Sequence, residues 1–309
     1  MNRLVSLSIV WLTLVAAAAG QHALPPANDQ PAHISVDVDL VVLQATITDR
    51  HGHLVTDLKE ENFQVYEDGV RQQIRLLLHE DVPVAVGLVV DHSGSMHRKL
   101  AEVSAAARTF VHSSNPDDQM FVVNFNEKVS LGLPSGIQLS HDASELERAI
   151  LNAPAGGKTA LYDAIAKASE HLKASTLDKK TLIVISDGGD NASTHTLKQV
   201  LTLAEQSNVI IYAIGIYDEE DPDRNPHVLK SLARATGGEA FFPDKVSFVV
   251  DICTRIARDI RNQYTIGYVP TNPMRNGGYR AIRAVARAPG QGKLFVRTRT
   301  GYIAHAPTN

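Results

Sequence analysis

The sequence predicts an α/β protein in which a doubly wound, mainly parallel sheet is inserted into a small antiparallel β domain. Apolar strands alternate with helical segments between residues 82 and 261, whereas strand-like alternation without helices lies before and after that stretch. The composition is that of an ordinary globular protein, with 309 residues, 44% hydrophobic and 21% charged. At about 100–200 residues per domain, this length suffices for one large domain or two modest ones.

The first 20 residues have the pattern of a cleavable signal peptide. Arg3 supplies a positive charge, the stretch Leu4–Ala19 is mostly apolar, and small residues follow at the expected cleavage region near Ala19–Gln21. A retained membrane anchor is the alternative, but the stretch is shorter than the ~20 apolar residues that a span needs. Residues 21–32 are polar and rich in proline, which indicates a flexible leader. We therefore expect a secreted or periplasmic protein with no transmembrane segment in the mature chain.

Residues 33–81 have the pattern of a small antiparallel β segment. Val36, Val38, Leu40 and Val42 alternate with other residues, and Ala45 and Ile47 continue the alternation. The stretch from Asp49 to Gly52 is typical of a turn. Residues 67–69, with the sequence Glu-Asp-Gly, predict a second turn, between strands at 63–66 and 73–77.

Residues 82–261 alternate apolar strands with amphipathic helices. Strands are expected at Val84–Val90, Met120–Phe125, Leu182–Ser186 and Val209–Ile216, with a shorter one near Glu239–Phe242. Helical spacing covers Lys99–Val111, Ala160–Lys173, Leu197–Gln206, Val228–Ala235 and Val246–Ile260. Strands that are apolar throughout and separated by helices are typical of a parallel sheet with helices on both faces.

Residues 262–304 return to a strand-like pattern, with strands expected at Tyr264–Val269, Tyr279–Ala286 and Lys293–Thr300. Residues 33–81 carry ten acids and four bases, net -6, whereas residues 262–309 carry seven bases and no acid, net +7. Neither segment has enough strands for a stable core of its own. We expect the two segments to pair into one β domain, helped by their opposite charges. A basic patch for nucleic acid or membrane lipid is the competing interpretation of the tail.

Charge and cysteine content exclude several classes of protein. The formal net charge of -4 argues against a nucleic-acid-binding protein as a whole. Cys253 is the one cysteine, so neither an intramolecular disulfide nor a cysteine-based zinc site is available. Its apolar neighbours indicate a small buried hydrophobic residue rather than a nucleophile. The histidines, including His92 and His97 beside the motif described next, are expected at the surface.

Carboxylate and hydroxyl side chains gather where the apolar strands end. Asp91 ends the strand that begins at Val84, and Ser93 and Ser95 follow at alternate positions. Asp187 follows the strand Leu182–Ser186, and Thr159 lies just before a helix. Because ligands of open α/β sheets collect at the carboxyl ends of strands, we expect these side chains to meet at one edge. Such oxygen ligands suit a hard divalent cation, Mg²⁺ first, with Mn²⁺ or Ca²⁺ as alternatives.

Taken together, these residues resemble the metal-ion-dependent adhesion site of the von Willebrand factor type A (VWA) family. The family pattern Asp-x-Ser-x-Ser matches Asp91, Ser93 and Ser95, its loop threonine matches Thr159, and its Asp-Gly matches Asp187-Gly188. The resemblance covers residues 82–261, including the order of strands and helices, and implies the Rossmann-like VWA fold there. The flanks are similar to a bacterial secreted branch called VWFA-related, through residues 58–63, 67–69, 264–268 and 299–302.

The resemblance implies a binding mechanism. The hydroxyls of Ser93, Ser95 and Thr159 would contribute ligands to the cation, while Asp91 and Asp187 would act directly or through water. A Glu or Asp side chain of a partner would complete the coordination, so that the metal acts as the bridge. We therefore expect an exported adhesion or binding module rather than an enzyme, with a protein or matrix ligand as its partner.

Two other functions stay open from the sequence. The first is a metal-assisted hydrolase, with Ser93 or Ser95 as the nucleophile or with metal-activated water, although no histidine is placed by sequence to act as the base. The second is a scaffold whose site is vestigial. The acidic run at residues 218–223 supplies Asp218, Asp221 and Asp223 as candidates for a partner-binding rim around the metal site. A second calcium site there is conceivable, but a solvated acidic loop is favoured.

Overall fold

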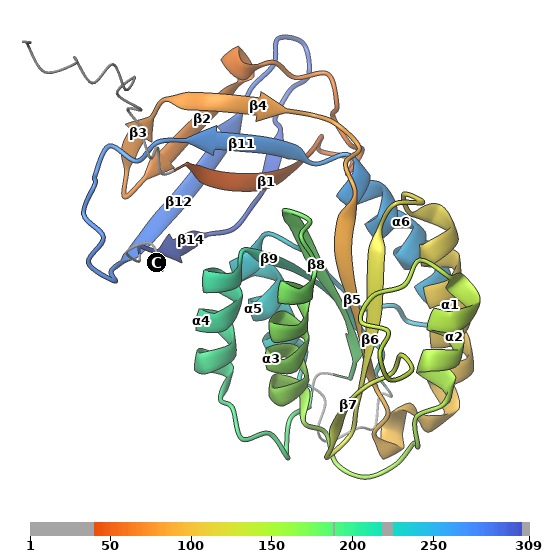
Figure 1. Ribbon diagram of the computed structural model, residues 1–309. Helices are drawn as coiled ribbons and strands as arrows, with labels where there is room; N and C mark the ends of the chain where they lie inside the picture. The colour runs from red at the N-terminus through yellow and green to blue at the C-terminus, as the bar shows by residue number, and fades with distance from the viewer. Residues whose placement is uncertain (1–39, 188, 218–224, 305–309) are drawn as a thin grey trace, which may run out of the picture. The chain divides into compact units, whose positions relative to one another are not determined.

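The computed structural model describes residues 40–187, 189–217 and 225–304. They form a six-stranded sheet with helices on both faces and two four-stranded sheets of a β domain, which is built from β1–β4 and β11–β14 (Figure 1). The expected signal peptide and leader, residues 1–32, lie outside these ranges. None of the helices in the described ranges combines the length and apolar character that a membrane crossing requires.

The central sheet carries the order β10-β9-β8-β5-β6-β7. Its strands are β5 (Val84–Asp91), β6 (Gln119–Phe125), β7 (Val129–Leu131), β8 (Lys179–Ser186), β9 (Val209–Gly215) and β10 (Ala240–Phe241). All neighbouring pairs are parallel except β6 with β7. Every residue of β5 and β9 is buried, which explains why these strands are apolar throughout. The prediction of a mainly parallel, helix-covered sheet is confirmed.

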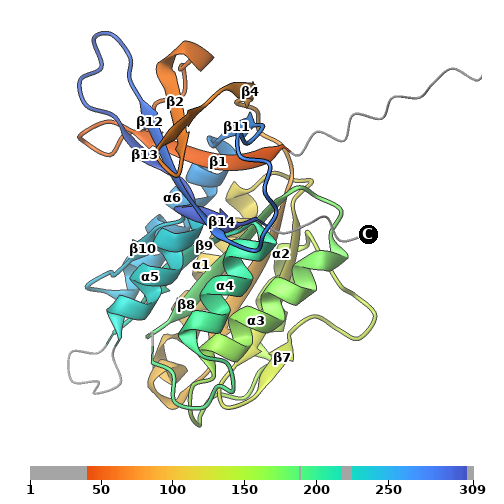
Figure 2. The ribbon, with the colours of Figure 1, turned by 90° about the vertical axis from the view of Figure 1, so that its left-hand side faces the viewer.

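Helices cover both faces of this sheet, with α1, α2 and α6 together on one face and α3, α4 and α5 on the other (Figures 1 and 2). The helices are α1 (Leu100–Ser113), α2 (Ala143–Leu151), α3 (Leu161–His171), α4 (Leu197–Ser207), α5 (Pro226–Thr236) and α6 (Val249–Arg261). Helix α2 was not expected from the sequence. It begins at the N-cap Asp142, whose carboxylate accepts the N–H groups of Ser144 and Glu145. The helix expected from Lys99 begins at Leu100, because a 3-10 turn spans Gly94–Lys99.

The N- and C-terminal segments pair into the two antiparallel sheets of the β domain, as predicted. One sheet has the order β13-β1-β11-β4 and the other β14-β12-β2-β3. The strands are β1 (Val41–Thr48), β2 (Phe63–Glu67), β3 (Val70–Gln72), β4 (Ile74–Leu78), β11 (Tyr264–Tyr268), β12 (Tyr279–Ala286), β13 (Phe295–Arg297) and β14 (Gly301–Ile303). Strand β1 pairs with β11, and β2 pairs with β12, so each sheet contains strands from both ends of the chain.

Three details of the β domain differ from the sequence-based expectation. In β1 the buried face is Val41, Leu43, Ala45 and Ile47, whereas Leu40 is exposed, so the alternation read from residues 36–42 has the wrong phase at its end. The turn at residues 67–69 joins β2 to β3, and β4 crosses to the other sheet. The strand expected at Lys293–Thr300 is shortened to β13, and a further strand, β14, begins beyond it at Gly301 in the other sheet. The last two differences arise because β4 and β14 each lie in a different sheet from the strand before them, which a local pattern does not encode.

The β domain is held mainly by an apolar cluster that contains residues from both segments, such as Leu43, Phe63 and Tyr264. The ion pair of Arg280 with Asp68, at 3.5 Å, joins the basic tail to the acidic head. Arg297, however, contacts the α/β domain: it donates to Asp259 of α6 at 2.5 Å and also to Glu239. The opposite net charges of the segments therefore accompany the pairing, but apolar burial is the larger contribution.

Short links join the two domains at the edge of the central sheet where its parallel strands begin. Strand β4 ends at Leu78 and β5 begins at Val84, and α6 ends at Arg261 just before β11 begins at Tyr264. The carboxyl ends of β5 and β8, where the predicted site residues lie, are at the opposite edge of the sheet. Site and β domain are thus separated by the length of the strands.

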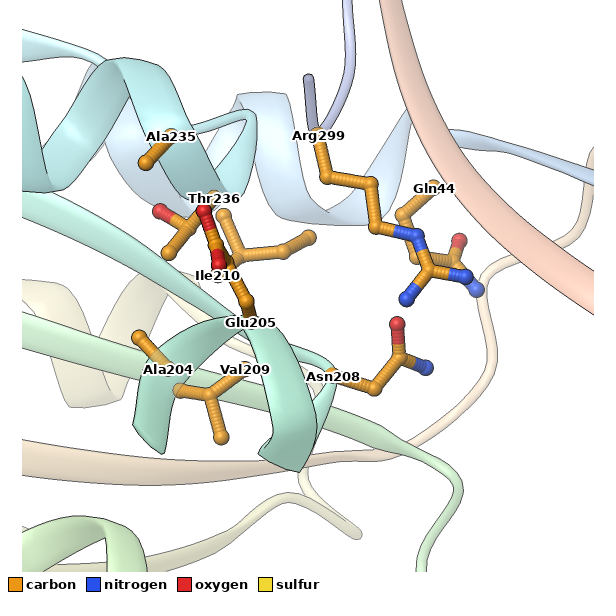
Figure 3. A pocket seen from close by; sticks show the side chains of 9 residues that line it. All are labelled: Gln44, Ala204, Glu205, Asn208, Val209, Ile210, Ala235, Thr236 and Arg299. Atoms are coloured by element: carbon orange, nitrogen blue, oxygen red, sulfur yellow. The ribbon is translucent and has the colours of Figure 1, made fainter. Parts of the chain in front are cut away.

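A small cavity of about 10 Å³ lies where the β domain meets the α/β domain (Figure 3). In Figure 3 the side chains of Gln44, Asn208 and Arg299 point toward one another, and Arg299 also donates to the carbonyl oxygen of Val42 at 3.0 Å. This volume accommodates about one water molecule. None of the five predicted metal ligands lines this cavity, so it does not belong to the candidate site.

Candidate functional site

Asp91 is the last residue of β5 and is fully buried. Its Oδ1 atom accepts the backbone N–H of Ser93 at 2.8 Å, and its Oδ2 atom accepts the hydroxyl of Ser186 at 2.6 Å. Burial, and after it the negative charge of Asp187, raises the pKa of Asp91 to about 6. The carboxylate is therefore held in place in an environment that penalises its negative charge.

The two serines connect Asp91 to Asp187 at the end of β8. The hydroxyls of Ser93 and Ser95 lie 3.2 Å apart, and Ser95 donates to Oδ2 of Asp187. Ser93 is the N-cap of the 3-10 turn that follows β5, so its hydroxyl and that of Ser95 emerge together from the strand end. Asp187 is buried, like Asp91. The structure thus brings four of the five sequence-predicted residues into one hydrogen-bonded group.

Thr159 reaches the same edge through backbone hydrogen bonds of its loop. Gly94 donates to the carbonyl oxygen of Gly157 at 3.4 Å, and Gly156 donates to that of His92 at 2.7 Å. These bonds lay the loop before α3 against the loop after β5. Thr159 itself is buried, with 6% of its surface exposed.

Glu127, which belongs to none of the sequence motifs, supports this loop from the side. Its carboxylate accepts the backbone N–H of Lys158 at 2.9 Å. Gly157 has a φ of +84°, and a Cβ atom there would lie 1.6 Å from Oε2 of Glu127. The positive φ favours glycine at this position, and a larger residue would also displace the Glu127 carboxylate.

The donor set fits a hard divalent cation. Within the described ranges, no three His, Cys, Asp or Glu side chains cluster so as to hold a metal by themselves. Hydroxyl oxygens must therefore contribute to any site here, and Mg²⁺ and Ca²⁺ accept such oxygen ligands. The negative charges of Asp91 and Asp187 also repel each other, and a cation between them would remove this repulsion.

His92 is buried, with 1% of its surface exposed, so the expectation that it lies at the surface is wrong. Its Nε2 atom lies 3.0 Å from Oδ1 of Asn124, and the Asn124 amide donates to the carbonyl oxygen of Ala149 at 2.7 Å. The amide orientation makes Nε2 of His92 the donor. Burial lowers the pKa of His92, which favours the neutral ring. This histidine is part of the core beside the site.

Two further sequence-based expectations concern residues near or outside this edge. Asp218, Asp221 and Asp223 lie outside the described residues, as does Gly188. Cys253 is buried on α6, as predicted, and burial raises the pKa of its thiol to about 12. Its burial and its protonated state make it a structural residue.

A comparison with solved structures found chains that are similar to this one. A structure described as von Willebrand factor type A from Catenulispora acidiphila is 15% identical, covers 85% of this chain and 74% of its own, and has a TM-score of 0.52. The vWF domain of the type V pili tip protein Mfa5 from Porphyromonas gingivalis is 15% identical, covers 58% of this chain and 95% of its own, with a TM-score of 0.49.

One curated relative is an uncharacterized protein of Borreliella burgdorferi. It is 28% identical over 152 residues, which are 47% of this chain. The match spans 44% of that relative, so the chain covers less than half of its length.

The sequence model of the von Willebrand factor type A domain matches residues 86–255, which is more than half of the chain. The matched stretch begins in β5 and ends in α6, and so contains the other strands of the central sheet and the strand ends that carry the candidate site. The parallel sheet, its helices on both faces and this match lead to one conclusion: the chain belongs to the von Willebrand factor type A domain family.

Proposed function

We propose that this protein is an exported binding module that recognises an acidic side chain of a protein or matrix partner through a bound Mg²⁺ ion. The observation that carries the proposal is the hydrogen-bonded group of Asp91, Ser93, Ser95 and Asp187 at the carboxyl edge of the sheet. The Thr159 loop packs against the same edge. VWA domains are often involved in adhesion and protein binding, which supports the same class of function.

Each residue of the site has a distinct part in this proposal. The hydroxyls of Ser93, Ser95 and Thr159 would hold the ion as neutral ligands, while Asp91 and Asp187 balance its charge from buried positions. If the two carboxylates act through water, the direct protein ligands are neutral hydroxyls, and the ion stays strongly attractive to an anionic ligand at its open position. When bound, the cation supplies positive charge and an exchangeable ligand position, which a partner's carboxylate can take. Mn²⁺ or Ca²⁺ could serve in place of Mg²⁺ by the same ligand chemistry.

Export is proposed from the sequence of residues 1–20, which has the pattern of a signal peptide. The mature protein would then act in the periplasm or outside the cell. Detection of a processed N-terminus near Gln21 by mass spectrometry would support this, whereas an intact Met1 in the fractionated protein would contradict it.

Calorimetric titration with Mg²⁺ tests the metal site. We expect wild type to bind the ion and Asp91→Ala and Asp187→Ala to lose detectable binding while staying folded. Asp142→Asn, which changes an exposed carboxylate at the start of α2, is the control and should bind as wild type does. Equal affinity of wild type and Asp91→Ala would contradict the site.

Affinity capture from native extract, with Mg²⁺ or with EDTA, tests the binding function. We expect a partner that is retained in Mg²⁺, released by EDTA and lost with Asp91→Ala. Glutamate-to-glutamine and aspartate-to-asparagine changes in that partner should then abolish capture. The hydrolase alternative predicts instead turnover of ester or phosphate substrates that disappears in Asp91→Ala. The vestigial-scaffold alternative predicts that wild type fails to bind Mg²⁺.

A further inference from the structure

Helix α3 begins without a cap of its own. Its N-cap is Ala160, which has no side chain able to accept the free N–H groups of the first turn. The N–H of Tyr162 instead donates to Oδ2 of Asp190 at 2.9 Å, and the N–H of Asp163 donates to the hydroxyl of Ser193 at 3.0 Å. Both acceptors belong to the loop that follows β8. The helix start is therefore capped by a segment distant in sequence, and that segment also carries Asp187.

The same loop holds the peptide groups of Thr159 on both sides. Oδ1 of Asn191 accepts the N–H of Thr159 at 2.9 Å. The carbonyl oxygen of Thr159 accepts the N–H groups of Asn191 and Ala192 at 3.0 and 3.1 Å. Thr159 is thus attached by three hydrogen bonds to residues four and five positions beyond Asp187.

A return contact completes the connection. Asp163 of α3 accepts the N–H groups of Thr194 and His195, each at 2.9 Å, and Nδ1 of His195 at 2.6 Å. Although burial acts in the other direction, these hydrogen bonds hold the pKa of Asp163 below its usual range. Hydrogen bonds therefore run in both directions between α3 and the loop after β8.

We infer that Asn191 is a positioning residue that sets the place of Thr159 relative to Asp187, an inference that rests on the metal site proposed above. The two residues come from loops on separate elements, β8 and α3, and the segment at 190–195 joins those loops directly. Coordination tolerates little displacement, so a ligand held by a neighbouring hydrogen bond loses affinity when that bond is removed. Asn191 supplies the one side-chain bond among the three that hold Thr159, and can be changed without altering the backbone.

A double-mutant cycle on Mg²⁺ affinity tests the inference. Changes to such supporting residues in metal sites typically weaken binding about 10–100-fold, and we expect about tenfold for Asn191→Ala because the two backbone bonds remain. Thr159→Ala should weaken binding too. Adding Asn191→Ala to Thr159→Ala should cause no further loss, because Asn191 acts through Thr159. Asn191→Asp, which keeps the acceptor oxygen, should restore binding to wild type's level or better.

The controls separate positioning from general stability. Thr196→Ala removes another hydrogen bond at the end of the same loop, where Thr196 caps α4, and should leave Mg²⁺ affinity unchanged. Thermal unfolding in EDTA confirms that each variant is folded. If Asn191→Ala does not fold, Asn191→Gln takes its place, because the longer side chain displaces the acceptor oxygen and should also weaken binding.

Two results would overturn the inference. One is an Asn191→Ala protein that binds Mg²⁺ as wild type does. The other is that Asn191→Ala weakens Mg²⁺ binding by the same factor in Thr159→Ala as in wild type. If wild type itself fails to bind Mg²⁺, the metal site is refuted rather than the role of Asn191 alone.

Discussion

Asp91→Asn should make the metal-free protein more stable while removing its affinity for Mg²⁺. The carboxylate of Asp91 is fully buried, and burial with the nearby Asp187 raises its pKa from 3.8 to about 6. A difference of about two pKa units corresponds to about 3 kcal/mol at ~1.36 kcal/mol per unit. At pH 8 Asp91 is ionised in both the folded and the unfolded state. The folded, metal-free wild type is therefore destabilised by about this amount of free energy.

The sign of the pH dependence follows from the raised pKa. The folded state binds the proton of Asp91 more tightly than the unfolded state does. The contribution of the protonated Asp91 to stability is therefore fully present below pH 3.8 and is lost as the pH rises through about 6. Asparagine is neutral throughout and still offers an oxygen to the N–H of Ser93. We therefore expect Asp91→Asn to exceed wild type by about 2–3 kcal/mol at pH 8 and to match it near pH 4.

Urea denaturation in EDTA at several pH values measures this difference. In a thermal scan at pH 8, the melting temperature of Asp91→Asn should exceed that of wild type by about 4–12 °C, at about 2–4 °C per kcal/mol for a protein of this size. Addition of Mg²⁺ should stabilise wild type and leave Asp91→Asn unchanged. Asp142→Asn is the matched control: hydrogen bonds from Glu145 and Ser144 lower the pKa of that exposed carboxyl, so its loss should not stabilise the protein. An Asp91→Asn protein less stable than wild type at pH 8 would refute the reasoning.

Three further predictions also concern buried groups. Asp259→Ala should lower the free energy of unfolding by about 3 kcal/mol in urea, because it removes one of the two carboxylates that pair with the largely buried guanidinium of Arg297, and a loss below about 1 kcal/mol would contradict this. Mg²⁺ affinity measured by calorimetry should fall about tenfold per pH unit below pH 6, since Asp91 must lose its proton to bind the ion. An affinity that stays the same from pH 5 to pH 8 would argue against that role. Cys253 should react with a thiol reagent only in denaturant, in which one equivalent should be consumed, whereas rapid labelling of the native protein would show that α6 opens.

Strands β5, β6, β8 and β9 of the central sheet could be predicted closely because they are buried on both faces, whereas the partly exposed β7 was not expected. Residues such as Val84 to Val90 are apolar without interruption, so their pattern needs no knowledge of a neighbour. Helix α2 was missed because it is short and its N-cap, Asp142, lies in a stretch rich in turn-forming residues. The β domain was harder, since its strands change sheets and only one face of each is buried. The phase of β1 and the sheets to which β13 and β14 belong depend on those partners.

The candidate site was predictable to the extent that it lies at strand ends. Asp91 and Asp187 follow apolar strands that are neighbours in the sheet, and parallel strands end at the same edge. Ser186, Glu127 and Asn191 could not be selected in this way, because each acts through a hydrogen bond to a residue distant in sequence. One local signal existed for Asp190 and Ser193 of the same loop: Ala160 is a poor N-cap, so α3 needs acceptors from another segment.

By itself, the amino-acid sequence determined the class of fold, the insertion of the α/β domain between two halves of a β domain, and the chemistry available at the strand ends. These depend on residue type and spacing, which the chain carries locally. Only the tertiary structure decided that the loop after β8 caps α3 and holds Thr159. It also decided that Arg297 pairs with Asp259 of α6 rather than with an acid of residues 33–81. Such contacts depend on which loops meet after the sheet has formed, and hydrogen bonding requires an agreement in position of a few tenths of an ångström that no local pattern can specify.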